Sequence, residues 1–293
     1  MKNANAQSPE TQRARQQERE QQERKLRERL GRIRHTVVVL SGKGGVGKST
    51  VAANLAVTLA AEGFEVGLLD ADMHGPSVPI LLDLKSAPVY SDGQNILPAE
   101  GRKGLRVMSI AFLARERDEA VIWRGPLKMN VLRQLLTDVE WGDLDFLVID
   151  LPPGTGDEPL SVCQLIPDAT GGIVVTTPQE LSVADVRKCI TFCRKLELPV
   201  LGVIENMSGF VCPHCGRSVD IFGEGGGQKM AEEMGVPFLG SVPIDPSIVE
   251  ACDAGRPFVE DSPESSSTRA FLEAVAPIVK LGRREQAEEP NKQ

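Results

Sequence analysis

The stretch Val37-Val-Val-Leu40-Ser-Gly42-Lys43-Gly44-Gly45-Val46-Gly47-Lys48-Ser49-Thr50 decides the fold of this 293-residue chain. It opens with an apolar run, which predicts a buried strand, and passes through glycines into the apolar periodicity of a helix at about 49–61. The order of strand, glycine-rich loop and helix satisfies the pattern G-x-x-x-x-G-K-[ST] of a phosphate-binding loop. The segment is therefore expected to bind the phosphates of a nucleotide.

The phosphate loop assigns different tasks to its backbone and its side chains. Backbone amides at a helix N-terminus point at phosphate oxygens, and the helix dipole favours their negative charge. Lys48 is expected to reach the β- and γ-phosphates, and the Ser49 hydroxyl is expected to face Mg²⁺. The residues expected to bind ATP and Mg²⁺ here are Gly42, Lys43, Gly44, Gly45, Val46, Gly47, Lys48, Ser49 and Thr50.

The same glycines admit a second interpretation, a dinucleotide site. Gly42-x-Gly44-x-x-Gly47 matches G-x-G-x-x-G, and Asp70 follows at the distance of an acid that binds the ribose of a nicotinamide cofactor. A dinucleotide site does not require Lys48-Ser49, and a second phosphate-side motif follows at Asp150-Leu-Pro-Pro-Gly154. Both features favour the phosphate loop.

Short apolar runs alternate with helical patterns along the rest of the chain. Runs at 66–69, 144–149, 172–176, 200–204 and 238–242 predict parallel strands, and helical patterns cover 127–139, 181–196 and 227–234. Residues 87–110 contain several Gly and Pro and predict a hairpin insertion. Because parallel strands need right-handed crossovers, we expect an α/β fold with a doubly wound, mostly parallel sheet, as in P-loop NTPases.

Carboxylates follow two of the predicted strands. Asp70 and Asp72 follow the strand at 66–69, and Asp150 ends the strand at 144–149. The carboxyl ends of parallel strands meet at one edge of a sheet, which would place all three beside the phosphate loop. We expect Asp150 to hold Mg²⁺ through water, and one of the first two to meet the metal while the other orients the attacking water. The alternative is that Asp70 and Asp72 are ordinary turn residues.

Composition limits the organisation and the partners. The net charge is −8, but residues 1–35 hold ten Lys or Arg against five Glu, which leaves about −13 for the remainder. Such a body lacks the basic surface of a DNA binder, and no apolar run is long enough to cross a bilayer. We expect no nucleic-acid or membrane partner, and a cytoplasmic location. The expected organisation is a charged arm at 1–35, helical or disordered, an ATPase domain at 36–281 with a cysteine loop near 206–227, and a polar, frayed tail at 282–293.

Two of the six cysteines form the motif Cys212-Pro-His-Cys215. A tetrahedral zinc or a four-iron cluster wants four ligands, so the two thiolates of one chain fall short. A redox C-x-x-C would open a helix, whereas this motif follows a predicted strand. A bridging metal group, zinc, and a thiol or disulfide role all stay open. Cys189 and Cys193 share one helix face and, with Cys163 and Cys252, are expected to pack as small apolar residues.

The loop Gly42-Lys43-Gly-Gly-Val-Gly-Lys48 resembles the deviant Walker motif of the MinD, ArsA and nitrogenase iron protein class. The resemblance narrows with Asp72-Met-His-Gly-Pro-Ser77, Trp123-Arg-Gly-Pro126, Glu205-Asn-Met-Ser208, Cys212-Pro-His-Cys-Gly216 and Ile221-Phe-Gly-Glu-Gly-Gly-Gly227. Together, over about 37–276, these motifs resemble the Mrp/ApbC family of iron-sulfur cluster carriers. Residues 1–35 contain neither the small extra N-terminal domain of many bacterial relatives nor the N-terminal four-cysteine site of eukaryotic cytosolic ones.

The resemblance implies a homodimer whose catalytic residues are Lys43, Lys48, Asp72 and Asp150. Lys43 would act across the dimer interface, Asp72 would activate water, and Asp150 would belong to a switch coupled to Mg²⁺. Asn206 and the segment Pro243-Ile-Asp245 would border the adenine ring. Cys212 and Cys215 of two subunits would bridge an iron-sulfur cluster, expected to be 4Fe-4S, which is received from scaffold or donor proteins and passed to apo-proteins.

Two other functions remain compatible with these residues. One is a positioning ATPase in the manner of MinD or ParA, with a structural zinc at the C-x-x-C motif. The other is an ATP-gated reductase resembling the nitrogenase iron protein, which would deliver electrons without losing iron.

Overall fold

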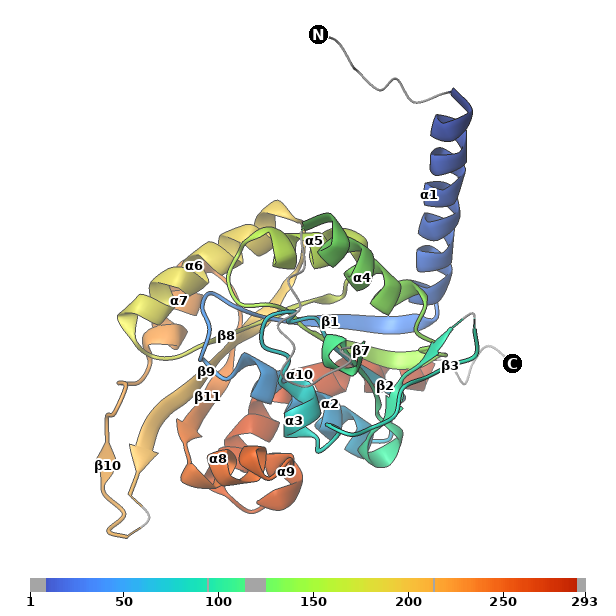
Figure 1. Cartoon of the computed structure of the whole chain (residues 1–293). Coiled ribbons are helices and arrows are strands. Elements are labelled where there is room, and N and C mark those ends of the chain that lie inside the picture. The colour runs from blue at the N-terminus through green and yellow to red at the C-terminus, as the bar shows by residue number, and fades with distance from the viewer. Residues whose placement is uncertain (1–8, 94, 114–124, 213, 289–293) are drawn as a thin grey trace.

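The computed structural model describes residues 9–93, 95–113, 125–212 and 214–288. Among these residues nine strands form one sheet with the path β10-β9-β8-β1-β7-β2-β6-β5, and β11 pairs with β9 (Figure 1). The pairings among β1, β2, β6, β7, β8, β9 and β11 are all parallel, while β5 and β10 pair antiparallel. The fold class expected from the sequence, a doubly wound and mostly parallel sheet, is confirmed.

The strands are β1 (Ile33–Ser41), β2 (Val66–Asp70), β3 (Tyr90–Ser91), β4 (Ile96–Leu97), β5 (Ala99–Glu100), β6 (Arg106–Ser109), β7 (Leu144–Asp150), β8 (Gly171–Thr176), β9 (Val200–Val211), β10 (Ser218–Val219) and β11 (Phe238–Ile244). The helices are α1 (Pro9–Leu30), α2 (Lys48–Ala61), α3 (Val78–Leu81), α4 (Gly125–Thr137), α5 (Asp157–Leu165), α6 (Glu180–Lys195), α7 (Gly226–Met234), α8 (Pro246–Asp253), α9 (Phe258–Asp261) and α10 (Ser266–Glu288), with 3₁₀ turns η1 (Arg102–Gly104) and η2 (Ile110–Leu113).

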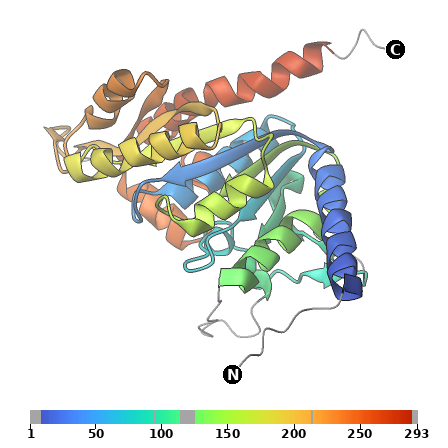
Figure 2. The same ribbon diagram turned by 90° about the horizontal axis from the view of Figure 1, so that it is seen from above.

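Helices cover both faces of the sheet and bury a core on each (Figures 1 and 2). Successive side chains of a strand point to opposite faces, so Val37 and Val39 of β1 pack against α2, α9 and α10, while Val38 and Leu40 pack on the side of α4, α5, α6 and α7. Strands covered on both sides are apolar throughout, which is why the buried runs were visible in the sequence.

Several elements differ from the sequence-based expectation. β1 begins at Ile33, so it takes in residues that were expected to belong to the arm. Only β3 and β4 form a separate hairpin within residues 87–110, because β6 pairs in parallel with β2 inside the main sheet. The sequence predicted a frayed tail from residue 282, whereas the described residues 282–288 continue helix α10. Residues 289–293 and 1–8, the ends of the expected tail and arm, lie outside the described residues.

The arm is helical over Pro9–Leu30, and its C-terminal end is fixed to the body (Figure 1). Leu26 is buried there, and Arg29 Nη1 lies 2.5 Å from Glu140 Oε2. Lys25 Nζ lies 2.8 Å from Asp138 Oδ1. Leu30 is partly buried against the same core. The helix therefore docks through Leu26, Leu30 and a few ion pairs, although its sequence shows no continuous apolar stripe.

Candidate functional site

The phosphate loop lies between β1 and α2 at the carboxyl edge of the sheet, as its sequence predicts. Gly45 and Gly47 adopt φ values of 79° and 84°, which glycine accepts without strain. A cavity of about 290 Å³ opens over the loop. Its walls include Ser41, Lys43, Gly44, Gly45, Gly47, Lys48, Ser49, Thr50, Asp72, Gly75 and Pro153. The structure thus brings together the loop and Asp72, which are more than 20 positions apart in sequence.

Lys48 and Asp150 form a buried ion pair beneath this cavity. Lys48 Nζ lies 2.5 Å from Asp150 Oδ1, and both side chains are almost inaccessible to solvent. Burial raises the pKa of Asp150, while the Lys48 ammonium opposes that rise. Asp150 Oδ2 is buried without a hydrogen-bond partner among the described residues. The Ser49 hydroxyl is a hydrogen-bonding neighbour of the Asp150 carboxylate. A carboxylate with an unpaired oxygen and a hydroxyl beside it are donors that a hard divalent cation prefers, so these residues fit Mg²⁺.

Asp70 and Asp72 have separate surroundings. Asp72 lines the cavity, and its Oδ1 accepts hydrogen bonds from the amides of His74 and Gly75, both at 3.1 Å. Asp70 is fully buried below, where it accepts from the amides of Asp72 and Val78 and from the Ser109 hydroxyl. The structure therefore gives Asp72 access to a substrate, whereas Asp70 supports the loop after β2 from within the core.

Burial and the nearby Asp150 raise the pKa of Asp70 to about 8. The folded protein holds this proton up to a higher pH than the unfolded chain, whose ordinary value is 3.8. The contribution of Asp70 to the free energy of unfolding is therefore fully present below pH 3.8 and is lost as the pH rises to about 8.

We predict that the nucleotide-free, metal-free protein loses stability between pH 6 and pH 8, by up to about 1.4 kcal/mol per pH unit from this group. Urea unfolding at pH 6, 7, 8 and 9 measures the slope. Asp70→Asn should flatten it, because the amide does not titrate in this range, and Asp72→Asn is the matched control that should keep it. A slope unchanged in Asp70→Asn would contradict the assignment of the proton to Asp70.

A second, apolar cavity of about 310 Å³ shares Gly47 and Thr50 with the first. Asn206, Pro243 and Asp245, the residues expected at the adenine ring, all line it. Asn206 Nδ2 donates to the Val46 carbonyl at 2.9 Å, which attaches β9 to the phosphate loop. Asp245 caps α8, because its Oδ1 accepts from the amide and hydroxyl of Ser247. An apolar space beside phosphate-binding residues suits a nucleotide base.

The same cavity has walls that the sequence analysis did not identify. They include Met207, Phe222, Ile248, Val249 and Cys252. Cys252 was expected only to pack, and Phe222 belongs to the glycine-rich segment after the C-x-x-C motif. Their approach to the phosphate loop depends on how β9, β11 and α8 pack together, and no local pattern signals it.

Cys212 and Cys215 lie in a turn between β9 and the antiparallel strand β10. We call residues 209–224 the cysteine hairpin. Within it the Cys212 amide donates to the Arg217 carbonyl at 3.0 Å, and the Gly216 amide donates to the Cys212 carbonyl at 2.8 Å. Cys212 is half-buried and Cys215 is exposed. Hydrogen bonds from the backbone and side chain of Arg217, and a third from Cys212, lower the pKa of the Cys215 thiol.

The two thiols are therefore adjacent, and the segment that follows them is the strand β10 and not a helix. Within residues 9–93, 95–113, 125–212 and 214–288, no group of three or more His, Cys, Asp and Glu side chains is arranged to hold a metal ion. Cys163, Cys189 and Cys193 are buried between α5 and α6, and burial raises the pKa of Cys163 to about 12. These three thiols pack as the sequence analysis expected.

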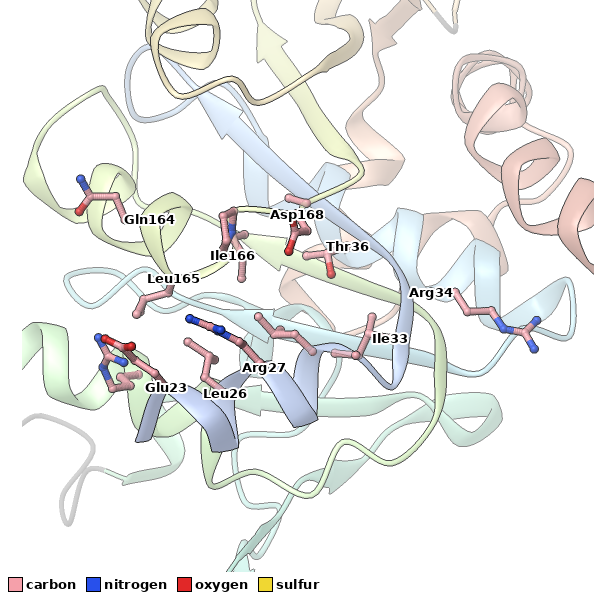
Figure 3. Close-up of a pocket in the computed structure, with 15 residues that line it drawn as sticks. Glu23, Leu26, Arg27, Ile33, Arg34, Thr36, Gln164, Leu165, Ile166 and Asp168 are labelled. Atoms are coloured by element: carbon pink, nitrogen blue, oxygen red, sulfur yellow. The ribbon is translucent and has the colours of Figure 1, made fainter. Parts of the chain in front are cut away.

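A larger cavity of about 860 Å³ lies between α1 and the loop that follows α5 (Figure 3). Leu26 and Arg27 border it on one side, and Leu165 and Ile166 border it on the other. It adjoins Ile33, where β1 begins, while the phosphate loop follows the other end of that strand. Nucleotides bind outside the carboxyl ends of parallel strands, so this cavity is not part of the nucleotide site.

None of the helices among the described residues is long and apolar enough to span a membrane. The expected motif at 123–126 is described only for Gly125 and Pro126, and residues 123 and 124 lie outside the described residues, as does Pro213 of the C-x-x-C motif.

Comparison with known proteins places the chain in a family. The chain is 51% identical over 249 residues to the iron-sulfur cluster carrier protein of Saccharolobus solfataricus, covering 85% of this chain and 84% of that one. It is 46% identical over 254 residues to the cytosolic Fe-S cluster assembly factor NUBP2 of Gallus gallus, covering 85% and 93%.

Solved structures agree with these relatives. A nucleotide-binding protein of Archaeoglobus fulgidus in complex with ADP matches with a TM-score of 0.74 and 41% identity, covering 86% of this chain and 96% of that one. The cell division ATPase MinD of Pyrococcus furiosus shares the fold at a TM-score of 0.60 and 24% identity, covering 85% and 99%. The family model described as ParA, NUBPL iron-transfer P-loop NTPase, matches residues 32–279, and the chain belongs to this family.

Proposed function

We propose that this protein is an ATP-dependent carrier that binds an iron-sulfur cluster between two subunits and transfers it to apo-proteins. The single observation that carries the proposal is the pair of adjacent thiols, Cys212 and Cys215, on an exposed hairpin beside a nucleotide site. A cluster needs four thiolates, and a twofold axis would bring two such pairs to one site. The exposure of this hairpin suits a cluster that is transferred to another protein. The names of the relatives, cluster carrier and cytosolic assembly factor, support this function and a cytosolic location.

The phosphate loop and its neighbours would hydrolyse ATP. Water attacks the γ-phosphorus, the bond from that phosphorus to the bridging oxygen breaks, and ADP leaves with the electron pair. Lys48 would stabilise the charge that develops on the β- and γ-phosphate oxygens. Asp72, whose Oδ1 is fixed by two backbone amides, would orient the water through its other oxygen and take its proton. Lys43, on the cavity wall, would reach the nucleotide of the partner subunit.

Mg²⁺ would be held by Ser49 and, directly or through water, by Asp150, where it would neutralise phosphate charge. Asp70 would support this edge of the sheet by fixing the amides of Asp72 and Val78. Asn206, Pro243 and Asp245 would enclose the base. The four-iron form of the cluster and the homodimer belong to this proposal, as do donor and acceptor proteins as partners.

Anaerobic reconstitution with iron and sulfide tests the proposal. We expect the wild-type protein to bind iron and acid-labile sulfide at about four each per dimer, as a single four-iron cluster requires. Cys212→Ser and Cys215→Ser should each reduce both to background, because the remaining thiolates cannot complete the ligand set. Cys252→Ser is the matched control, since Cys252 lines the base cavity and lies outside the cysteine hairpin.

Size-exclusion chromatography with light scattering on the same samples reports whether the cluster-loaded species is the dimer. Tight zinc binding without cluster formation would contradict the carrier function and favour a positioning ATPase with a structural metal. A cluster that cycles between redox states and is never released to an apo-acceptor would favour the ATP-gated reductase.

A further inference from the structure

Glu205 is a fully buried carboxylate in β9, and the proposed function gives it no role. Its Oε1 accepts from the Ser208 hydroxyl at 2.5 Å and from the Gly225 amide at 2.8 Å, and its Oε2 accepts from the Gly227 amide. A carboxylate that accepts from three donors is strongly hydrogen-bonded in a low-dielectric interior.

These three donors lie on both sides of the cysteine hairpin. Ser208 directly precedes residues 209–224, and Gly225 and Gly227 directly follow them, at the N-terminus of α7. Two further observations show how little room the end of the hairpin has. A Cβ on Gly226 would lie 2.3 Å from the Pro178 carbonyl oxygen, and a Cβ on Gly227 would lie 2.9 Å from Glu205 Oε2. One carboxylate therefore joins the two ends of the hairpin in a tightly packed place.

The next residue joins the same point to the nucleotide site. Asn206 donates to the Val46 carbonyl in the phosphate loop at 2.9 Å. Met207 and Phe222 line the base cavity, and Phe222 belongs to the cysteine hairpin itself. A nucleotide in the base cavity would thus contact the hairpin and the residue beside Glu205 at once.

We propose that Glu205 is a positioning residue that holds both ends of the cysteine hairpin against the nucleotide site, so that nucleotide binding changes the setting of Cys212 and Cys215. The proposal rests on the proposed carrier function, because it explains how ATP could act on the cluster site. The alternative is that Glu205 only caps α7, in which case its loss would lower stability and leave the response of the thiols to nucleotide unchanged.

Thiol alkylation in the reduced, cluster-free full chain separates these roles. Rates at Cys212 and Cys215 are measured by mass spectrometry of the peptides, with and without a non-hydrolysable ATP analogue and Mg²⁺. In the wild type we expect the two states to differ by about fivefold at Cys215, at the low end of usual coupling between sites. Glu205→Gln should bring that ratio close to one, because a side-chain amide cannot accept from all three donors. The affinity of this variant for a fluorescent ATP analogue should stay within about twofold of wild type, a change of less than 0.5 kcal/mol.

Glu224→Gln is the matched control. Glu224 is exposed and belongs to the same hairpin, and its substitution removes the same charge without touching these hydrogen bonds, so the wild-type ratio should persist. Ser208→Ala removes one donor and leaves the carboxylate in place, so it should give an intermediate ratio. It also provides the test if Glu205→Gln does not fold.

A wild-type ratio in Glu205→Gln, or in Ser208→Ala where the first variant is unfolded, would overturn the proposal. So would a wild-type protein whose thiols do not respond to the nucleotide. If the thiols respond and depend on Glu205 but reconstitution yields no cluster, then the carrier function fails and the positioning role of Glu205 stands.

Discussion

Lys48→Ala is expected to lower the rate of ATP hydrolysis by about a hundredfold or more, the usual consequence of removing a group that stabilises transition-state charge. Lys48 is the ammonium of the phosphate loop, and its Nζ lies 2.5 Å from Asp150 beneath the phosphate cavity. Release of inorganic phosphate under saturating MgATP measures the effect. Lys280→Ala is the control, because Lys280 is exposed on α10, far from the loop in sequence and on a different element.

The same substitution has a second expected result in the absence of nucleotide. Asp150 would remain fully buried without its counter-charge, and breaking a buried pair in this way costs about 3–5 kcal/mol, less whatever Asp150 recovers by taking up a proton. The double variant Lys48→Ala with Asp150→Asn should therefore unfold at a higher urea concentration than Lys48→Ala alone. Hydrolysis within tenfold of wild type in Lys48→Ala would contradict the role assigned to this lysine.

The parts of the site that could be predicted are those encoded by short, continuous patterns. The phosphate loop needs a strand, glycines and a helix in order, and residues 33–61 form β1, the loop and α2 in that order. Asp72 and Asp150 could be assigned to the same edge because parallel strands end there together, and the register that pairs Asp70 with Asp150 bears this out.

The parts that could not be predicted depend on contacts between distant residues. β6 was placed in the hairpin insertion because residues 87–110 contain several Gly and Pro. The strand character of Arg106–Ser109 comes from its pairing with β2. The docking of α1 rests on ion pairs such as Arg29 with Glu140, more than a hundred positions apart. Glu205 was quoted within a motif and given no role, because its partners at Gly225 and Gly227 become visible only when β9 and α7 are packed together.

Gly47→Ala is expected to lower the affinity for ATP by about tenfold or more, which is 1.4 kcal/mol. Gly47 has a φ of 84°, and an L-residue in that region costs roughly 1–2 kcal/mol. In addition, a Cβ at Gly47 would lie 2.2 Å from Asn206 Nδ2, so either Asn206 or the loop must move. Because Gly47 borders both the phosphate cavity and the base cavity, the movement should disturb both halves of the nucleotide site.

Gly63→Ala separates the strain from the contact. Gly63 has a φ of 89°, and no atom of the described residues lies within 4 Å of a Cβ placed there, so its variant carries the same backbone strain without the collision. Titration of a fluorescent ATP analogue and thermal unfolding are measured for both variants. Both should unfold at lower temperature than the wild type, whereas only Gly47→Ala should lose affinity for the nucleotide. Equal affinities in the two variants would mean that the contact between Asn206 and the phosphate loop does not shape the nucleotide site. The assignment of this cavity to the nucleotide base would then need to rest on residues other than Asn206.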